Sequence, residues 1–285
     1  MFVNQLKTFT LLVLIGGLLV FAGQFVGGAE GAFVALIFAV VMNLFTYFFS
    51  DKLVLAAYGA VQLNAKQYPA IYSMVEELAV QAQIPMPRLF LIDTPMANAF
   101  ATGRNPQTAA VAVTTGILNL LDADELRGVL AHELSHVKNR DILIATVAAT
   151  FAMAISYIAS MIRWSFFWGS SRRNENKNWI GTLLVAIIMP IAATLIQLAI
   201  SRSREYEADA TGANICRSPL ALASALQKIS SSAKAHSFND ATYAQQAASS
   251  MFICSPFSGA SLVNLFSTHP PTAERVKRLE KMNIF

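Results

Sequence analysis

Four long apolar runs, none of which contains a charged residue, dominate this sequence. They cover Phe9 to Val26, Ala32 to Ser50, Ile142 to Ile162 and Trp179 to Ile200. A helix that crosses the hydrocarbon core of a bilayer needs about 20 such residues. The overall composition agrees, because only 13% of the residues are charged, against about 25% in soluble domains. The sequence therefore predicts a mainly α-helical integral membrane protein with four hydrophobic helices.

The runs divide the chain into four parts. Residues 1–50 are expected to form a two-helix membrane anchor, with a tight turn at Gly27 to Gly31, and residues 142–200 a second hydrophobic hairpin. The segments 51–141 and 201–285 then become two halves of one α+β domain outside the membrane, with a small sheet.

The distribution of charged residues predicts the orientation of this domain. Lys and Arg gather on the cytoplasmic side of membrane proteins. Lys7 and Lys52 stand at the two ends of the first hairpin, and Glu30 lies in its turn. The domain is therefore expected to face the cytoplasm. The connection at 163–178 is also basic, so the second hairpin either violates this rule or does not fully cross.

Local signals predict the elements of the domain. Apolar periodicity predicts a helix from Pro69 to Ile84, and Asp122 with Glu125 forms the capping box of a second helix. The stretch from 230 to 250 is rich in Ser, Ala, Gln and Asn and is predicted to be a loop. Short strands are expected at Leu89 to Ile92 and Ala109 to Thr115, with Asn98 to Thr102 as a third candidate.

The second helix carries the pattern His132-Glu133-Leu134-Ser135-His136. Residues four apart share one helical face, so the two imidazoles can bind one ion, while Glu133 lies about 100° round beside them. A carboxylate in that position can take a proton from a water molecule that the metal activates. The pattern predicts a zinc metalloprotease site; the alternative is two structural histidines on a helix surface.

A catalytic zinc needs a third protein ligand and one open position. The long motif with a third histidine is excluded, because it requires Gly and His where this chain has Asn139 and Ile142. A distant glutamate remains, and Glu205 and Glu207 both follow the fourth apolar run. Glu205 and Asp209 share a helical face, so one could bind the metal while the other orients a histidine ring. Alternatively, these acids pair with neighbouring arginines on a solvated surface.

The spacing of the third and fourth apolar runs supports this region. The point midway between His136 and Glu205 falls at 170 to 171, in the centre of the 163–178 connection. An antiparallel hairpin of the two runs would bring His136 and Glu205 level at its base. We therefore expect the site at the cytoplasmic surface of the membrane.

Near the C-terminus, His269 precedes Pro270-Pro271. A histidine fixed at a helix entrance could donate to the oxyanion of a tetrahedral intermediate. An ordinary surface turn fits the same spacing. The helix that follows is predicted to be amphipathic, with apolar positions at Val276, Leu279 and Met282.

Three motifs together resemble the HtpX-type family of bacterial heat-shock membrane proteases and, more distantly, the CAAX prenyl endoproteases of eukaryotes. They are the zinc helix with its continuation from His132 to Asp141, the element from Glu205 to Asp209, and the element from His269 to Arg275. They occur in the same order, and the resemblance covers essentially the whole chain. It implies a zincin-like domain with one Zn²⁺ per chain, bound by His132, His136 and Glu205.

The resemblance also implies the roles of other residues. It makes Glu133 the general base and then the general acid, Asp209 a residue that orients a ligand, His269 a stabiliser of the transition state, and Arg275 a support of the site. An edge strand is expected to bind extended substrate through main-chain hydrogen bonds. This strand contains Asn98, Ala99 and Phe100.

The function implied is a zinc-dependent endopeptidase of the bacterial inner membrane that degrades misfolded or damaged membrane proteins under stress. The expected partners are polypeptide substrates and the lipid bilayer. A net charge of +4 without a dense basic stripe gives no reason to expect nucleic acid. A processing protease of narrow specificity and a non-catalytic membrane scaffold or chaperone are the alternatives. The sequence gives neither the individual substrates nor the oligomeric state.

Overall fold

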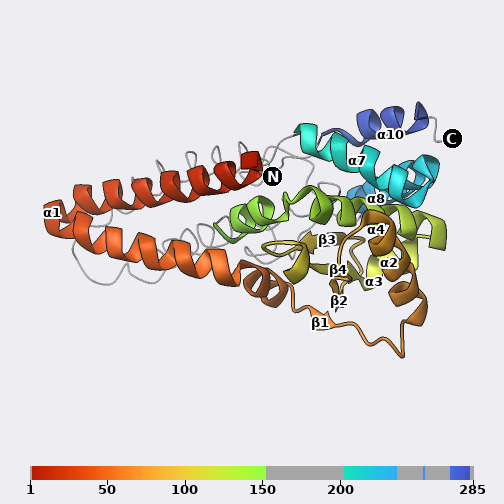
Figure 1. The fold of residues 1–285 in the computed structure, drawn as a ribbon, viewed down its shortest axis with the longest axis horizontal. Coiled ribbons are helices and arrows are strands. Elements are labelled where there is room, and N and C mark those ends of the chain that lie inside the picture. Colours follow the sequence, from red (N-terminus) through yellow and green to blue (C-terminus); the bar gives the residue numbers. More distant parts are fainter. Residues whose placement is uncertain (1, 152–201, 236–252, 254–269, 283–285) are drawn as a thin grey trace.

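The computed structural model describes residues 2–151, 202–235, 253 and 270–282. A long helical hairpin projects from one side of a domain in which helices surround a small sheet (Figure 1). Most of the predicted third hydrophobic helix and all of the fourth lie outside the described residues, as does His269. A helical hairpin and a small sheet are present as predicted, and the division of the chain into four parts stays a prediction.

The projecting hairpin is α1 (Phe2–Ala57), whose backbone turns at Gly27-Gly28. Gly28 has a φ of 59°, a left-handed conformation that glycine adopts without strain. The two arms touch next to this turn, because a side chain on Gly31 would collide with the carbonyl of Gly23. The glycines predicted to form the turn therefore allow both the reversal and the close approach of the arms.

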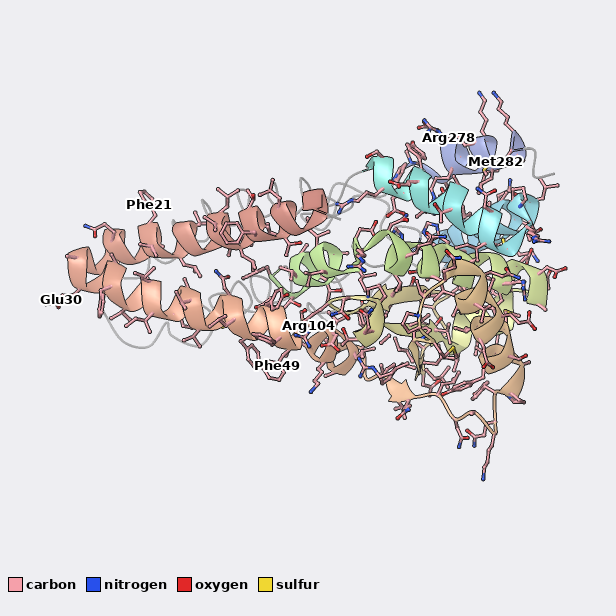
Figure 2. All side chains as sticks on the ribbon, viewed as in Figure 1. Phe21, Glu30, Phe49, Arg104, Arg278 and Met282 are labelled. Atoms are coloured by element: carbon pink, nitrogen blue, oxygen red, sulfur yellow. The ribbon has the colours of Figure 1, made fainter. Side chains whose placement is uncertain are left out.

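The hairpin has the surface and length of a membrane anchor. Large apolar side chains cover the outside of its arms, as Phe21 shows (Figure 2). The second arm, Gly27–Ala57, has a mean hydropathy of 2.2, and within the described ranges it is the single helix long enough to cross a bilayer. Inside the hairpin, the Asn43 side chain donates a hydrogen bond to the Leu12 carbonyl at 3.1 Å.

The domain is built on four strands: β1 (Val61–Gln62), β2 (Arg88–Ile92), β3 (Ala99–Thr102) and β4 (Ala110–Thr114). Their order in the sheet is β1-β2-β4-β3. β2 and β4 are parallel, whereas the other two pairs are antiparallel. Within the described part of the chain β3 pairs with β4 alone and forms one edge. The predicted strands are confirmed, and β1 is too short to show an alternating pattern.

Among the described residues, α4 (Ala123–Asn139) packs on the sheet, and three helices pack against α4: α2 (Pro69–Ala82), α7 (Arg202–Cys216) and α8 (Pro219–Ala235). α10 (Thr272–Glu280) packs on α8 and α7. A short helix, α3 (Thr115–Leu120), follows β4, because the Thr114 side chain accepts a hydrogen bond from the Ile117 N–H and caps it. The strand predicted from Ala109 to Thr115 therefore ends one residue early. α2 begins at Pro69 as predicted but ends two residues before Ile84. α10 buries Val276 and Leu279 as predicted, whereas Met282 lies beyond its end.

The predicted loop at 230–250 is wrong up to Ala235, where α8 ends. Leu226 and Ile229 are buried in the domain core, which stabilises the helix despite its polar continuation. The remainder of that predicted loop lies outside the described residues.

α4 lies between α7 and α8 and also contacts α2 and β3. Two glycines permit this packing. A Cβ on Gly212 would lie 2.8 Å from the His132 Cα, and one on Gly128 would lie 3.0 Å from the Leu222 Cα. Because helix backbones can approach this closely only where a side chain is missing, these glycines fix α7 and α8 against α4.

The two faces of the sheet pack against different parts of the molecule. Ala99 and Ala101 of β3 belong to the core shared with α4. Phe100 points to the opposite face, where it packs with Val54 and Leu55 at the end of α1. This cluster, which also contains Ile92 of β2 and Ala112 of β4, packs the end of the hairpin on the sheet.

Candidate metal centre

The position of the histidines follows from how α4 begins. The Asp122 side chain accepts from the Glu125 N–H at 2.9 Å, and the Glu125 side chain accepts from the Asp122 N–H at 3.1 Å. This is the predicted capping box. Three helical turns later, Ser135 Oγ donates to the Ala208 carbonyl of α7 at 3.1 Å. The capped start and this cross-link place the histidine face of α4 against α7.

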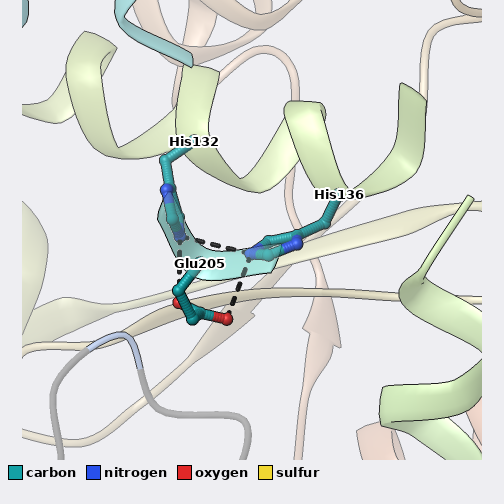
Figure 3. Close-up of side chains that lie close together, drawn as sticks. All are labelled: His132, His136 and Glu205. Atoms are coloured by element: carbon teal, nitrogen blue, oxygen red, sulfur yellow. Dashed lines mark hydrogen bonds and ion pairs between the residues drawn. The ribbon is translucent and has the colours of Figure 1, made fainter. Parts of the chain in front are cut away.

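His132, His136 and Glu205 converge (Figure 3). The two Nε2 atoms are 3.2 Å apart, and each lies 3.8 Å from one carboxylate oxygen of Glu205. Glu205 and Asp209 are buried, whereas Glu207 is exposed. Glu205 and Asp209 therefore share one buried face of α7, as their spacing predicts, and do not lie on a solvated acidic surface. Their roles at the site stay predictions.

Each imidazole is oriented by a carboxylate on its other nitrogen. Asp209 Oδ1 lies 3.0 Å from His132 Nδ1, and Asp141 Oδ2 lies 3.1 Å from His136 Nδ1. These carboxylates favour a proton on each Nδ1, which would leave each Nε2 lone pair on the side of Glu205. A metal-binding histidine requires this tautomer.

The chemistry of these three donors fits zinc. Two imidazole nitrogens and one carboxylate oxygen form a known catalytic ligand set. In a tetrahedral site with metal–ligand bonds of about 2.0–2.1 Å, the ligands lie roughly 3.3 Å apart, close to the separations found between the two Nε2 atoms and Glu205. A buried arrangement of facing lone pairs and a carboxylate favours a cation between them.

The pKa of His136 shows that the residues around its ring favour a positive charge there. Burial opposes protonation of its ring, yet Asp141, Glu205 and Glu133 raise its pKa to about 10. A divalent cation satisfies the same carboxylates while leaving the imidazole neutral.

Arg275 of α10 lies beside the site and binds Asp209 of α7. Its Nε and Nη2 donate to the two oxygens of Asp209 at 2.8 and 2.6 Å, and its Nη1 donates to the Ile253 carbonyl at 2.8 Å. Burial would raise the pKa of Asp209, but the Arg275 guanidinium lowers it to about 2. Asp209 therefore stays ionised beside His132. The supporting position predicted for Arg275 agrees with these contacts.

Glu133 lies beside the ligands and is held by the sheet. The Ala101 N–H of β3 donates to Glu133 Oε2 at 2.9 Å. Burial raises the pKa of Glu133 above its usual range, an effect that His132 and His136 counteract. A carboxylate with a raised pKa is a stronger base, which suits a group that must accept a proton and return it.

The predicted substrate-binding residues lie on and beside this strand. Asn98 is buried, and its Oδ1 accepts from the Ile253 N–H at 3.1 Å. The side chain of Ala99 faces α4, and that of Phe100 faces the end of α1. The predicted edge strand is therefore present, and its role in substrate binding stays a prediction.

Asp141 and Gly212 are parts of the site that sequence reasoning missed. Arg140 ends α4 with a φ of 57°, so the chain folds back and the Asp141 N–H donates to the His136 carbonyl at 3.2 Å. An acid that follows a left-handed helix end is the local signal that could have indicated Asp141. Gly212 has no local signal, because its close contact is with another helix.

Comparisons with known proteins agree with this geometry. A family model described as peptidase family M48 matches residues 65–283. The chain is 51% identical over 280 residues to a protease HtpX homolog of Persephonella marina, covering 98% of this chain and 97% of the relative. It is 52% identical over 279 residues to a protease HtpX homolog of Ralstonia pickettii, covering 98% and 96%.

Among solved structures, the crystal structure of S. mikatae Ste24p is similar over 98% of this chain and 66% of that chain, with a TM-score of 0.49 and 19% identity. The family assignment rests instead on the family model and on the relatives that are half identical along their whole length. The chain therefore belongs to peptidase family M48 and is a membrane-bound metalloprotease of the HtpX type.

Proposed function

We propose that this metalloprotease is a zinc-dependent endopeptidase that hydrolyses peptide bonds of misfolded or damaged membrane proteins. The observation that carries the proposal is the convergence of His132, His136 and Glu205, with Glu133 beside them and a carboxylate behind each histidine. One zinc ion per chain would be held by these three ligands, with a fourth position open to water and substrate.

When bound, zinc polarises the scissile carbonyl and lowers the pKa of water towards 7. Glu133 accepts the proton of the attacking water and then delivers it to the leaving amine. The Ala101 N–H fixes the Glu133 carboxylate at 2.9 Å, so its free oxygen keeps one direction during both transfers. Asp209 and Asp141 hold the histidine rings in the tautomer that leaves Nε2 free to bind.

β3 is suited to receive the substrate. It is an edge strand that contacts Glu133 through Ala101, so an extended polypeptide added along it would run past the general base. Asn98, Ala99 and Phe100 belong to this substrate-binding element in our proposal, and His269 supplies the hydrogen bond to the oxyanion.

The hairpin supports membrane proteins as the substrates. Its end packs on β3, so the site lies next to the point where the chain leaves the bilayer. We place the protein in the bacterial inner membrane as a multi-pass protein with the domain in the cytoplasm, because Lys7 and Lys52 lie near the two ends of α1, far from its turn.

Glu133→Gln tests the enzymatic assignment. The detergent-purified chain and the variant are compared for zinc content and for cleavage of an unfolded protein. Glutamine is nearly isosteric and is not a zinc ligand, so the variant should keep its zinc. Cleavage should fall by about 10²–10⁴-fold, because glutamine cannot accept the proton.

Glu205→Gln serves as the matched comparison, since it removes the same charge from a ligand and should lower zinc content as well. Equal turnover by wild type and Glu133→Gln would contradict the mechanism, and a zinc-free, chelator-insensitive wild type would contradict the metal assignment. Cleavage of a single sequence only would favour a processing protease.

A further inference from the structure

A cavity of about 600 Å³ lies where the hairpin meets the domain, and its lining includes none of the three candidate metal ligands. Both arms of α1 line it near the domain, through Phe9 and Leu12 on the first arm and Leu44 on the second. The domain side is formed by the loop that contains Arg104 and by Arg140, which ends α4. One wall is therefore apolar and continuous with the anchor, and the other is basic.

The depth of this cavity corresponds to the headgroup region of a bilayer. From the turn at Gly28 to Tyr47, which also lines the cavity, the helix rises roughly 29 Å. This matches the hydrocarbon thickness of about 30 Å. The Arg104 guanidinium lies 6.0 Å from the Tyr47 ring and 5.1 Å from the Phe48 ring, and tyrosine is typical of membrane interfaces. Figure 2 shows Arg104 at this junction.

The positive charge of the cavity favours an anionic ligand. Arg104 and Arg140 are its two ionised side chains, and no acidic side chain among the described residues lines it. Guanidinium groups bind phosphate through paired N–H donors. Asn43 and Gln107 add amide donors to the same lining. A free phosphate would satisfy the basic wall but would leave the apolar wall in contact with water.

We propose that this cavity is a binding site for one anionic phospholipid. The phosphate lies between Arg104 and Arg140, and an acyl chain follows Phe9, Leu12 and Leu44 along the hairpin. Basic pockets between transmembrane helices bind anionic lipid headgroups on the cytoplasmic side of membranes. The bound lipid would join the anchor to the end of the zinc helix, because Arg140 immediately follows α4.

The test is native mass spectrometry of the full-length chain in detergent, titrated with phosphatidylglycerol, phosphatidylcholine or inorganic phosphate. Phosphatidylglycerol should bind one molecule per chain, more tightly than phosphatidylcholine. The double variant Arg104→Gln/Arg140→Gln should weaken this binding about thirtyfold. Glutamine is compatible with the backbone at position 140, because Gln83 ends α2 with nearly the same φ of 58°.

Lys277→Gln/Lys281→Gln is the control, since it removes the same charge from exposed positions on and just beyond α10. It should bind phosphatidylglycerol as the wild type does. A second cavity variant, Leu44→Trp, keeps both arginines and fills the apolar wall, so it should also weaken binding. The thermal unfolding of every variant is measured alongside, which separates lost binding from lost folding.

Three results would overturn the proposal. The first is equal binding of both lipids by the wild type. The second is unchanged phosphatidylglycerol binding by folded cavity variants. The third is displacement of the lipid by millimolar inorganic phosphate, which would make the site a phosphate site. If the folded cavity variants bind phosphatidylglycerol as the wild type does but have a raised KM for a protein substrate, the cavity binds the polypeptide instead.

Discussion

The two ends of α4 both bury acidic side chains, but they treat them differently. At the N-terminal end, Glu125 receives hydrogen bonds from Ser224 Oγ at 2.6 Å and Lys228 Nζ at 2.7 Å, in addition to its capping box. At the C-terminal end, Glu133 and Glu205 face two imidazoles. The first acid is matched by groups of its own fold, whereas the second pair is arranged around a place for a cation.

The N-terminal end of α4 thus contributes to the stability of the fold, and the C-terminal end carries the residues for catalysis. A buried acid that is matched by hydrogen bonds and a basic partner stabilises the native state. A cluster with more acceptors than donors carries a cost in the folded protein, which Arg275, 3.8 Å from Glu205, offsets in part and which a bound metal or proton offsets further. The contacts at the N-terminal end therefore fix the position of α4, which keeps the metal-binding side chains at its C-terminal end in place.

Gly212→Val should have the largest effect, because it should lower both the stability of the fold and zinc binding. A Cβ at this position meets the backbone of His132 at 2.8 Å, so α7 must move away from α4. We expect a loss of about 3 kcal/mol in stability and, because Glu205 and Asp209 move with α7, loss of zinc binding. Thermal unfolding and zinc content measure both effects. Thr211→Val is the control; a stable, zinc-loaded Gly212→Val protein would disprove the packing argument.

Asp141→Asn should affect the C-terminal end alone. Asp141 lies 3.1 Å from His136 Nδ1 and keeps the ring oriented. Outer carboxylates of this kind contribute about 10–100-fold to metal affinity. Zinc affinity, measured by competition with a chelator, should fall by that factor while the helix stays capped. Asp124→Asn, an exposed change at the other end of α4, should leave it unchanged. Equal zinc affinity of Asp141→Asn and wild type would exclude this role.

Glu125→Gln should have the smallest effect, and on stability only. Burial raises the pKa of Glu125, but hydrogen bonds from Lys228 and Ser224 lower it below its ordinary value of 4.5. The ionised carboxylate therefore stabilises the protein above pH 4.5, and this contribution disappears as the pH falls through the folded pKa. The variant should lose about 1 kcal/mol at neutral pH.

Unfolding curves of wild type and Glu125→Gln should converge in acid, and zinc affinity should not change. Glu76→Gln, an exposed substitution on α2, controls for the lost charge. A difference between wild type and Glu125→Gln that persists well below pH 4.5 would show that packing, rather than ionisation, is what Glu125 contributes.

Sequence reasoning located the features that depend on local geometry. The capping box at Asp122 and the spacing of His132 and His136 follow from the helix period alone. The same period indicated that Glu205 and Asp209 share a face. It could not choose the ligand between them, because the choice depends on how far α7 lies from α4, which Gly212 sets.

Other features were missed because they depend on tertiary contacts, which the helix period does not reveal. Asp141 reaches His136 only because Arg140 adopts a left-handed conformation. α8 was read in part as a loop, because the burial of Ile229 is visible only in the folded domain. The hairpin, in contrast, was predictable, since apolar length and glycines are properties of the sequence itself.

The packing of Val54 and Leu55 against Phe100 has a mechanical consequence. In the membrane position that we propose for Tyr47, the helix rises roughly 10 Å from the bilayer surface to Val54. Val54 shares an apolar cluster with Phe100 of the strand that holds Glu133. The active site would then stand at a fixed height above the lipid. A segment anchored in the bilayer can be cut only if it unravels far enough to span that height, so a firmly embedded helix is spared by distance alone.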